Sequence, residues 1–169
     1  ETELKSADLS NSRVIGFATH GLVGGELSGM AEPALVLTPP ANRSDLDDGL
    51  LTASEVAELN LNADIVLLSA CNTASGETLG AEGLSGLARA FIYAGARSLL
   101  VSHWSVESGA AAELTTGLFE ALEANPEMGR AEALKNSMMS LASDDENPHY
   151  SHPAFWAPFS LIGEGAVLK

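Results

Sequence analysis

The stretch IVLLSAC, residues 65–71, is apolar almost throughout and ends in the only cysteine of the chain. Its length suits one β-strand, and apolar side chains at successive positions indicate a strand that is buried on both faces. Two further stretches share the pattern, RVIGFAT at residues 13–19 and RSLLVS at residues 97–102. The three stretches together predict a mostly parallel central sheet.

Segments whose apolar residues recur at helical spacing lie between these strands and after the last of them. TASE, residues 52–55, has the spacing of a capping box and predicts a short helix that ends near Asn60. Apolar residues at helical spacing predict a helix from Glu82 that is closed by Gly95, and two more helices around residues 114–122 and 131–141. Strands that alternate with helices predict an α/β fold in which helices flank the sheet.

Prolines mark two weaker strands. ALVL at residues 34–37 stands before two prolines and predicts a minor strand or hairpin arm. The last element, residues 155–162, is apolar but contains Pro158, which has no N–H to donate. We therefore expect this strand at the outer edge of the sheet.

Composition excludes several classes of protein. The 169 residues fit one domain, and 46% of them are hydrophobic, without any run long enough to span a membrane. Eight Lys and Arg against 23 Asp and Glu give a net charge of −15, which disfavours nucleic acid and anionic membranes as partners. One cysteine cannot form an internal disulfide, and no signal peptide opens the chain, so we expect a cytoplasmic protein.

The residues that follow the three buried strands carry the candidate chemistry. His20, Cys71 and His103 all come at the carboxyl ends of strands, where ligand sites of parallel sheets lie. A Cys thiolate is a strong nucleophile, and a neighbouring histidine can lower its pKa. His20 precedes Cys71 by 51 residues, close to the spacing found in caspases. The alternative is a cysteine buried as a small hydrophobic residue beside a loop histidine.

Six ordered motifs resemble one family of peptidases. They are FATHG (17–21), DGLLTASE (48–55), LSACNT (68–73), AFIYAGARS (90–98), SHWSV (102–106) and FWAPFSLIG (155–163). Together they resemble the CHAT domain, a caspase-like family related to separases that often accompanies tetratricopeptide repeats. The resemblance covers most of residues 1–169 and implies the catalytic, C-terminal portion of a caspase–hemoglobinase-like sandwich. The family domain has further strands before the histidine strand, which we expect to be absent from this chain or supplied by another.

The resemblance implies a cysteine endopeptidase that works through a Cys–His dyad without a cofactor. Cys71 would attack the scissile carbonyl, and His20 would move the protons. The backbone N–H groups of Gly21 and Cys71 are the expected donors to the oxyanion. A partner chain or an upstream tetratricopeptide-repeat region would regulate the cleavage of a protein substrate. The alternative is a catalytically silent caspase-like interaction module.

The substrate pocket is predicted to accept a basic side chain before the cut. Arg97 is expected at the opposite rim and Arg89 in a helix, which leaves only Arg43 as a cation that could bind an acidic side chain. Carboxylates are plentiful near the expected site. We expect the pocket to be lined by Ser69, Asn72, Glu77, Trp104 and Glu107, although ordinary surface charge is the alternative for the two glutamates and core packing for Trp104.

Other kinds of site have little support in the sequence. His149 and His152 are three residues apart, but no companion ligands stand at metal spacing, so we expect no metal site. No phosphate-binding loop, dinucleotide-binding motif or serine nucleophile elbow is present. Nucleotidase, dehydrogenase and lipase functions therefore lose their main support.

Overall fold

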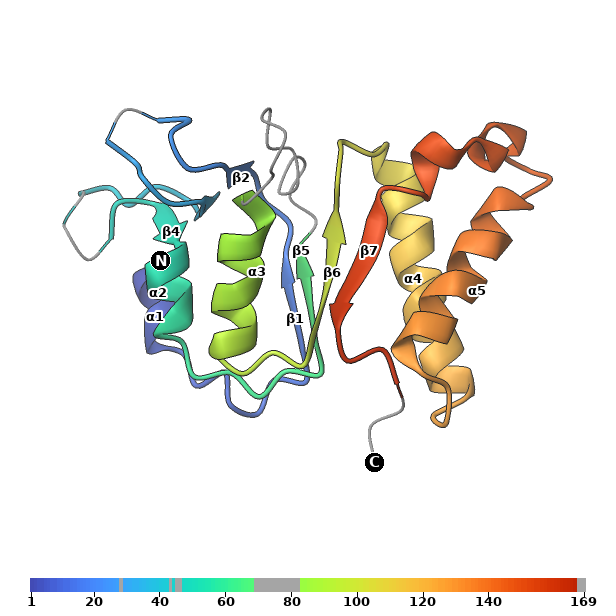
Figure 1. Cartoon of the computed structure of the whole chain (residues 1–169), viewed down its shortest axis with the longest axis horizontal. Coiled ribbons are helices and arrows are strands. Elements are labelled where there is room, and N and C mark those ends of the chain that lie inside the picture. Colours follow the sequence, from blue (N-terminus) through green and yellow to red (C-terminus); the bar gives the residue numbers. More distant parts are fainter. Residues whose placement is uncertain (28, 43, 45–46, 69–82, 167–169) are drawn as a thin grey trace.

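The computed structural model describes residues 1–27, 29–42, 44, 47–68 and 83–166, which form two sheets and five α-helices (Figure 1). The main sheet contains β1 (Val14–Phe17), β5 (Ile65–Leu68), β6 (Ser98–Ser102) and β7 (Phe159–Gly163). A small sheet contains β2 (Gly21–Leu22), β3 (Ala34–Val36) and β4 (Leu50–Thr52). The helices are α1 (Thr2–Ser6), α2 (Ala53–Ala57), α3 (Gly83–Tyr93), α4 (Ser108–Ala124) and α5 (Arg130–Ala142).

The main sheet has the strand order β1-β5-β6-β7. β1, β5 and β6 are parallel to one another, and β7 runs antiparallel to β6 at the outer edge. Three parallel strands and an outermost last strand confirm the predicted architecture. The carboxyl ends of β1, β5 and β6 therefore lie at one rim, which we call the carboxyl rim (Figure 1).

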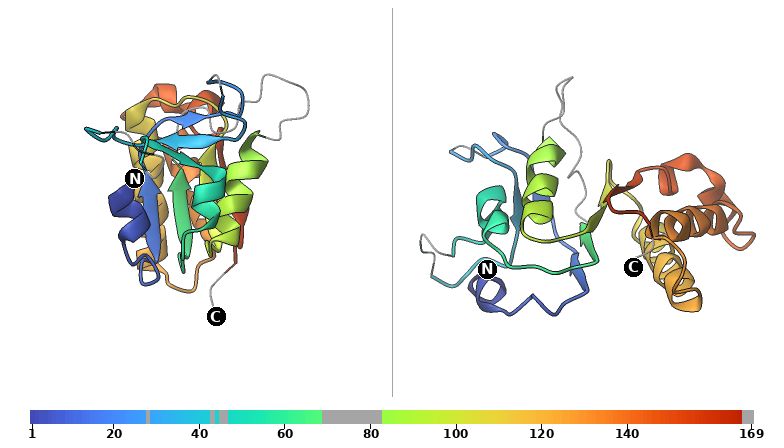
Figure 2. Two further views of the ribbon diagram at one scale, coloured as in Figure 1. Left: turned by 90° about the vertical axis from the view of Figure 1, so that its left-hand side faces the viewer. Right: turned by 60° about the horizontal axis from the view of Figure 1, so that its bottom comes forward.

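Helices cover both faces of the main sheet at β5 and β6, whereas β1 at the edge has only Phe17 buried, so the expected burial of this strand on both faces was wrong. α2, α3 and the small sheet lie on one face, and α4 and α5 lie on the other (Figure 2). In β6 the side chains of Leu99 and Val101 belong to the first core, whereas Leu100 belongs to the second. All five residues of β6 are buried, which explains why the sequence of this strand shows no alternation.

The opposite rim, at the amino ends of the parallel strands, is fixed by ion pairs around one carboxylate. Asp64 directly precedes β5 and is buried. Its oxygens accept hydrogen bonds from Arg13 Nε and Arg97 Nη1, each at 2.6 Å. These contacts join the starts of β1, β5 and β6, and they confirm that Arg97 lies at the rim opposite the candidate site.

Local signals set the ends of several elements. Thr52 and Glu55 form the predicted capping box, although α2 ends at Ala57 rather than near Asn60. The final strand begins at Phe159, later than expected, because the preceding prolines favour a short 3-10 turn at Pro153–Phe155. α1 and the strands β2 and β4 were not predicted, since each is too short to produce a periodic pattern. In the part of the chain that the structure describes, no helix has the length and apolar character needed to cross a bilayer.

Candidate active site

One row of paired residues defines the carboxyl rim. Phe17 of β1 is paired with Leu68 of β5, and Leu68 with Val101 of β6. His20, Cys71 and Trp104 each follow their member of this row by three residues. Neighbouring strands lie about 4.8 Å apart, so Phe17, Leu68 and Val101 end their strands side by side at this rim.

His20 is held by its backbone while its side chain is exposed. The His20 carbonyl accepts a hydrogen bond of 2.8 Å from the Val36 N–H, and the Thr19 hydroxyl donates to the Val36 carbonyl. The histidine thus stands where β1 ends and the small sheet begins. In the described part of the chain, no residue makes a hydrogen bond to its imidazole.

Gly21 presents its N–H away from the small sheet. Gly21 is paired with Leu35 in the antiparallel ladder between β2 and β3, and the hydrogen bond from Val36 to His20 closes the adjacent pair. Bonded and non-bonded pairs alternate in such a ladder, so the Gly21 pair is the non-bonded kind. Its N–H is therefore not used by β3 and can donate to another acceptor.

The segment after β6 is fixed by hydrogen bonds to the C-terminal part of the chain. His103 Nε2 lies 2.9 Å from the Ser160 hydroxyl oxygen of β7. Trp104 donates from its indole nitrogen to the Ala154 carbonyl at 3.1 Å, and 43% of the residue remains exposed. The exposed indole is thus oriented at the carboxyl rim and is not part of either core, so the packing alternative for Trp104 loses its support.

Glu107 caps the N-terminus of α4. Its carboxylate accepts from the backbone N–H groups of Gly109 at 3.2 Å and Ala110 at 3.1 Å, and from the Tyr150 hydroxyl at 2.9 Å. The Ala110 N–H and then the Tyr150 hydroxyl favour the charged form and lower the pKa of Glu107. Glu107 is therefore negatively charged at the carboxyl rim, but its carboxylate oxygens already accept hydrogen bonds from the start of α4 and from Tyr150.

Replacing Glu107 with glutamine is expected to lower the Tm at neutral pH, because the charged cap stabilises the helix start. The folded-state pKa is lowered, so this stabilisation is complete above the ordinary pKa of 4.5 and is lost as the pH falls through the folded-state value. The Tm values of wild type and Glu107→Gln should therefore converge as the pH falls below 4.5. Glu120→Gln on the same helix changes the charge equally without removing a cap, and a similar convergence there would contradict the explanation.

Several predicted residues lie outside the described part of the chain. They are Ser69, Cys71, Asn72 and Glu77, together with Arg43. Their sequence positions remain informative, because Leu68 is the last described residue before them. Of the predicted residues that the structure describes, His20 and Gly21 follow the carboxyl end of β1, and Trp104 and Glu107 follow that of β6. The cysteine segment remains a prediction.

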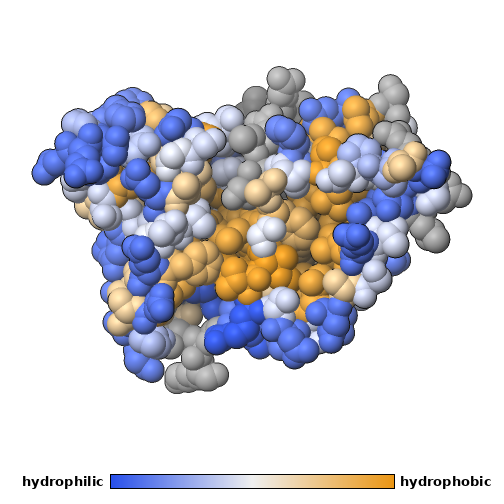
Figure 3. Space-filling model, turned by 180° about the vertical axis from the view of Figure 1, so that it is seen from behind, coloured by the Kyte–Doolittle hydropathy of each residue, from blue (hydrophilic) through white to orange (hydrophobic). Residues whose placement is uncertain are grey.

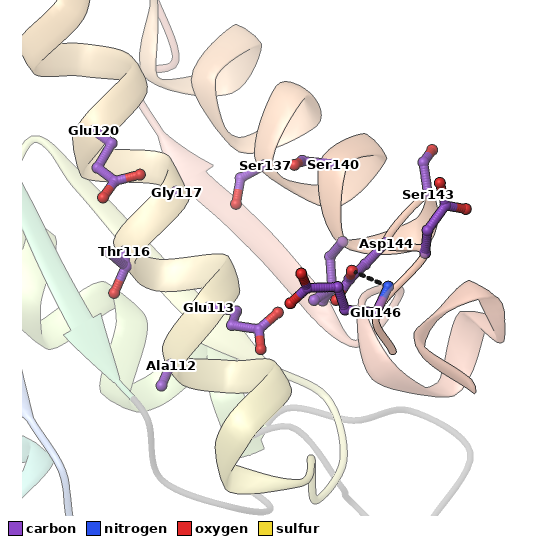
Figure 4. Close-up of a pocket in the computed structure, with 12 residues that line it drawn as sticks. Ala112, Glu113, Thr116, Gly117, Glu120, Ser137, Ser140, Ser143, Asp144 and Glu146 are labelled. Atoms are coloured by element: carbon purple, nitrogen blue, oxygen red, sulfur yellow. Dashed lines mark hydrogen bonds between the residues drawn. The ribbon is translucent and has the colours of Figure 1, made fainter. Parts of the chain in front are cut away.

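An acidic cavity of about 650 Å³ lies between α4, α5 and the turn after α5 (Figure 4). Its lining includes Glu113, Glu120, Asp144 and Glu146, and the Asp144 carboxylate accepts a hydrogen bond of 2.8 Å from the Glu146 N–H. None of the predicted catalytic and pocket residues that the structure describes lines it, so this cavity is separate from the described part of the candidate active site.

The two C-terminal histidines have structural contacts. The His149 ring packs against the rings of Tyr150 and Phe155, at centroid distances of 4.3 and 5.4 Å. His152 Nδ1 accepts a hydrogen bond of 3.2 Å from the Ala154 N–H and caps the short turn there. Both contacts help to shape the segment to which Trp104 is bonded.

The family model for the CHAT domain matches residues 1–164, nearly the whole chain. The chain belongs to the CHAT domain family. Curated proteins similar to this CHAT chain include tetratricopeptide repeat protein 28 of Mus musculus, 37% identical over 124 residues, and that of Homo sapiens, 35% identical over 128 residues. The matches cover 71% and 73% of the CHAT chain. The chain spans 5% of the length of each relative.

Proposed function

We propose that this CHAT chain is the catalytic portion of a cysteine endopeptidase that uses Cys71 and His20. The observation that carries the proposal is the common register of Phe17, Leu68 and Val101. His20 and Cys71 follow adjacent parallel strands at the same offset, so a short turn after each strand suffices to bring imidazole and thiol together. The caspase-like character of the family supports the same chemistry.

In the proposed reaction, Cys71 Sγ attacks the scissile carbonyl as a thiolate, and His20 protonates the leaving amine. A water molecule then hydrolyses the thioester, with His20 accepting its proton. The N–H groups of Gly21 and Cys71 donate to the oxyanion in both steps. The unbonded direction of the Gly21 N–H in the β2–β3 ladder supports this role.

We propose that the pocket beside the dyad accepts a basic residue before the cut. Trp104 would contact the side chain, with Ser69 and Asn72 lining the pocket and Glu77 and Glu107 adding negative charge. Three described arginines, Arg13, Arg97 and Arg130, lie away from this rim, so none of them could bind an acidic side chain there. A peptide set that varies only this residue should give a kcat/KM for Arg or Lys about 10- to 100-fold above that for Gln. A preference for Asp would contradict the acidic pocket.

Covalent labelling distinguishes an active cysteine endopeptidase from a catalytically silent interaction module. An acyloxymethyl-ketone probe with a terminal lysine should modify the chain once at neutral pH, at Cys71, and His20→Ala should abolish this labelling. Slow labelling that is indifferent to His20 would instead indicate a silent interaction module. Peptide mapping after labelling identifies the modified residue, and the single cysteine makes the assignment unambiguous.

We also propose that the enzyme acts in the cytoplasm under the control of a tetratricopeptide-repeat region or a partner chain. The names of the curated relatives support this association. Adding purified repeat segments to the CHAT chain, with peptide cleavage as the readout, tests the regulation directly. A change in kcat/KM supports it, whereas an unchanged value with bound repeats contradicts it.

A further inference from the structure

The antiparallel pairing of β2 with β3 ends at His20 with one hydrogen bond missing. Gly21 is paired with Leu35, so His20 lies opposite Val36. In a hydrogen-bonded antiparallel pair, the two residues exchange both of their N–H···O=C bonds. The Val36 N–H donates to the His20 carbonyl at 2.8 Å, but in the described ranges of the chain the His20 N–H donates to no residue. The Val36 carbonyl therefore lacks its regular donor.

The Thr19 hydroxyl replaces this missing donor. It donates to the Val36 carbonyl, which the His20 N–H would use in a regular ladder. Both polar backbone groups of Val36 are thus bound by consecutive residues of the chain, the carbonyl by Thr19 and the N–H by His20. The side-chain donor satisfies the Val36 carbonyl and lets the backbone leave the ladder at His20.

The position of the His20 imidazole depends on this backbone. The side chain is exposed, and none of the residues that the structure describes makes a hydrogen bond to the ring. Thr19 is half-buried and β-branched, so its hydroxyl has few rotamers and its hydrogen bond restrains the adjoining backbone. A displacement of about 1 Å in a catalytic group can cost about 100-fold in rate. The link between Thr19 and Val36 therefore bears directly on the reaction proposed for His20.

We infer that Thr19 is a positioning residue: its hydroxyl fixes the backbone that presents the His20 imidazole to Cys71. The inference rests on the proposed function, in which these two side chains form the dyad. Thr19 acts through His20 and exchanges no proton with the substrate. Loss of the hydroxyl should therefore lower kcat, which depends on the alignment of imidazole and thiol, and should change KM little.

Thr19→Val removes the hydroxyl and keeps the branched shape of the side chain. With a fluorogenic peptide that carries a basic residue before the cut, kcat is expected to fall about tenfold and KM to change less than about twofold. Thr19→Ser keeps a hydroxyl and should return kcat to within about threefold of wild type. The pKa of the Cys71 thiol should rise in the valine variant and not in the serine variant.

Thr115→Val is the matched control. The Thr115 hydroxyl also donates to a backbone carbonyl, that of Ala111 at 2.7 Å, and Thr115 is half-buried like Thr19. It belongs to α4, on the face of the main sheet opposite the small sheet (Figure 2). Seen from behind, an apolar surface lies between β1 and α4 (Figure 3). Loss of the Thr115 hydroxyl should therefore leave kcat and the thiol pKa at their wild-type values.

Amide hydrogen exchange of Val36 gives a readout that does not depend on activity. Exchange should become at least about tenfold faster in Thr19→Val, because the pair with His20 loses one of its two links. Unchanged exchange would overturn the inference.

The kinetic outcomes separate the inference from the proposed function. A wild-type kcat in Thr19→Val, no recovery in Thr19→Ser or an equal loss in Thr115→Val would overturn the inference alone, provided that His20→Ala is severely impaired. An inactive wild type, or one whose activity is indifferent to His20→Ala, would overturn the proposed function and the inference with it.

Discussion

Cleavage of a peptide with a basic residue before the scissile bond is expected to fall by about 10²- to 10⁴-fold when His20 is replaced by alanine. The expected loss comes from removing the group that activates the thiol and protonates the leaving amine. Cys71→Ala should reduce the rate to the uncatalysed background, since no covalent intermediate can form. The measurement is kcat/KM for a fluorogenic peptide, with equal Tm values showing that each variant is folded.

His103→Ala provides the matched control for the histidine. His103 is also exposed at the carboxyl rim and follows β6, which like β1 is adjacent to β5. It differs from His20 because it stands two residues after the paired row, not three, and because its Nε2 lies 2.9 Å from the Ser160 hydroxyl oxygen. Its loss should change kcat/KM by less than about tenfold, through the position of the neighbouring Trp104. The reverse order, a severe loss in His103→Ala and a mild loss in His20→Ala, would remove His20 from the proposed mechanism.

Gly95→Ala is expected to cost about 4 kcal/mol or more of the free energy of unfolding. Gly95 ends α3 with a φ of 113°, and the N–H groups of Gly95 and Ala96 donate to the Ile92 and Phe91 carbonyls. These two hydrogen bonds form a Schellman motif. A Cβ at Gly95 would lie 2.9 Å from the Leu61 carbonyl carbon and closer still to its oxygen. Since the obstacle is backbone, no side chain can move aside.

Gly25→Ala separates the two causes of this loss. Gly25 also has a positive φ, of 87°, but nothing lies within 4 Å of the added Cβ. Its cost should be about 1–2 kcal/mol, the conformational penalty alone. Denaturant unfolding measures both variants. Similar losses at the two positions would show that contact with the Leu61 carbonyl adds nothing to the stability effect.

The sequence predicts the strands of the main sheet well, because β5 and β6 are buried on both faces and are therefore apolar throughout. The expected burial was wrong for β1, an edge strand in which only Phe17 is buried. β1, β5 and β6 are all continuous apolar runs, and Pro158 marks the edge position of the strand that follows it. The start of α4 is harder to predict. Its first turn contains only small residues. Its N-cap is Glu107, whose carboxylate accepts hydrogen bonds from the first-turn N–H groups, whereas N-caps are usually Ser, Thr, Asp or Asn.

The candidate site, too, could be predicted from the sequence only in part. Parallel strands end at one rim, so the sequence alone predicts that His20 and Trp104 follow strands there, and the same reasoning extends to Cys71 as a prediction. Sequence reasoning missed the role of Val36, which holds the backbone of His20, because the pairing of β2 with β3 joins segments without a periodic signal.

The pKa of the Cys71 thiol tests the central claim most directly. It is measured from the pH dependence of iodoacetamide alkylation, and Cys71 is the only thiol in the chain. A thiol paired with His20 should have a pKa at least about one unit below the ordinary value of about 8.5, and His20→Ala should return it toward that value. A pKa at or above about 8.5 that is unchanged by His20→Ala would contradict the dyad.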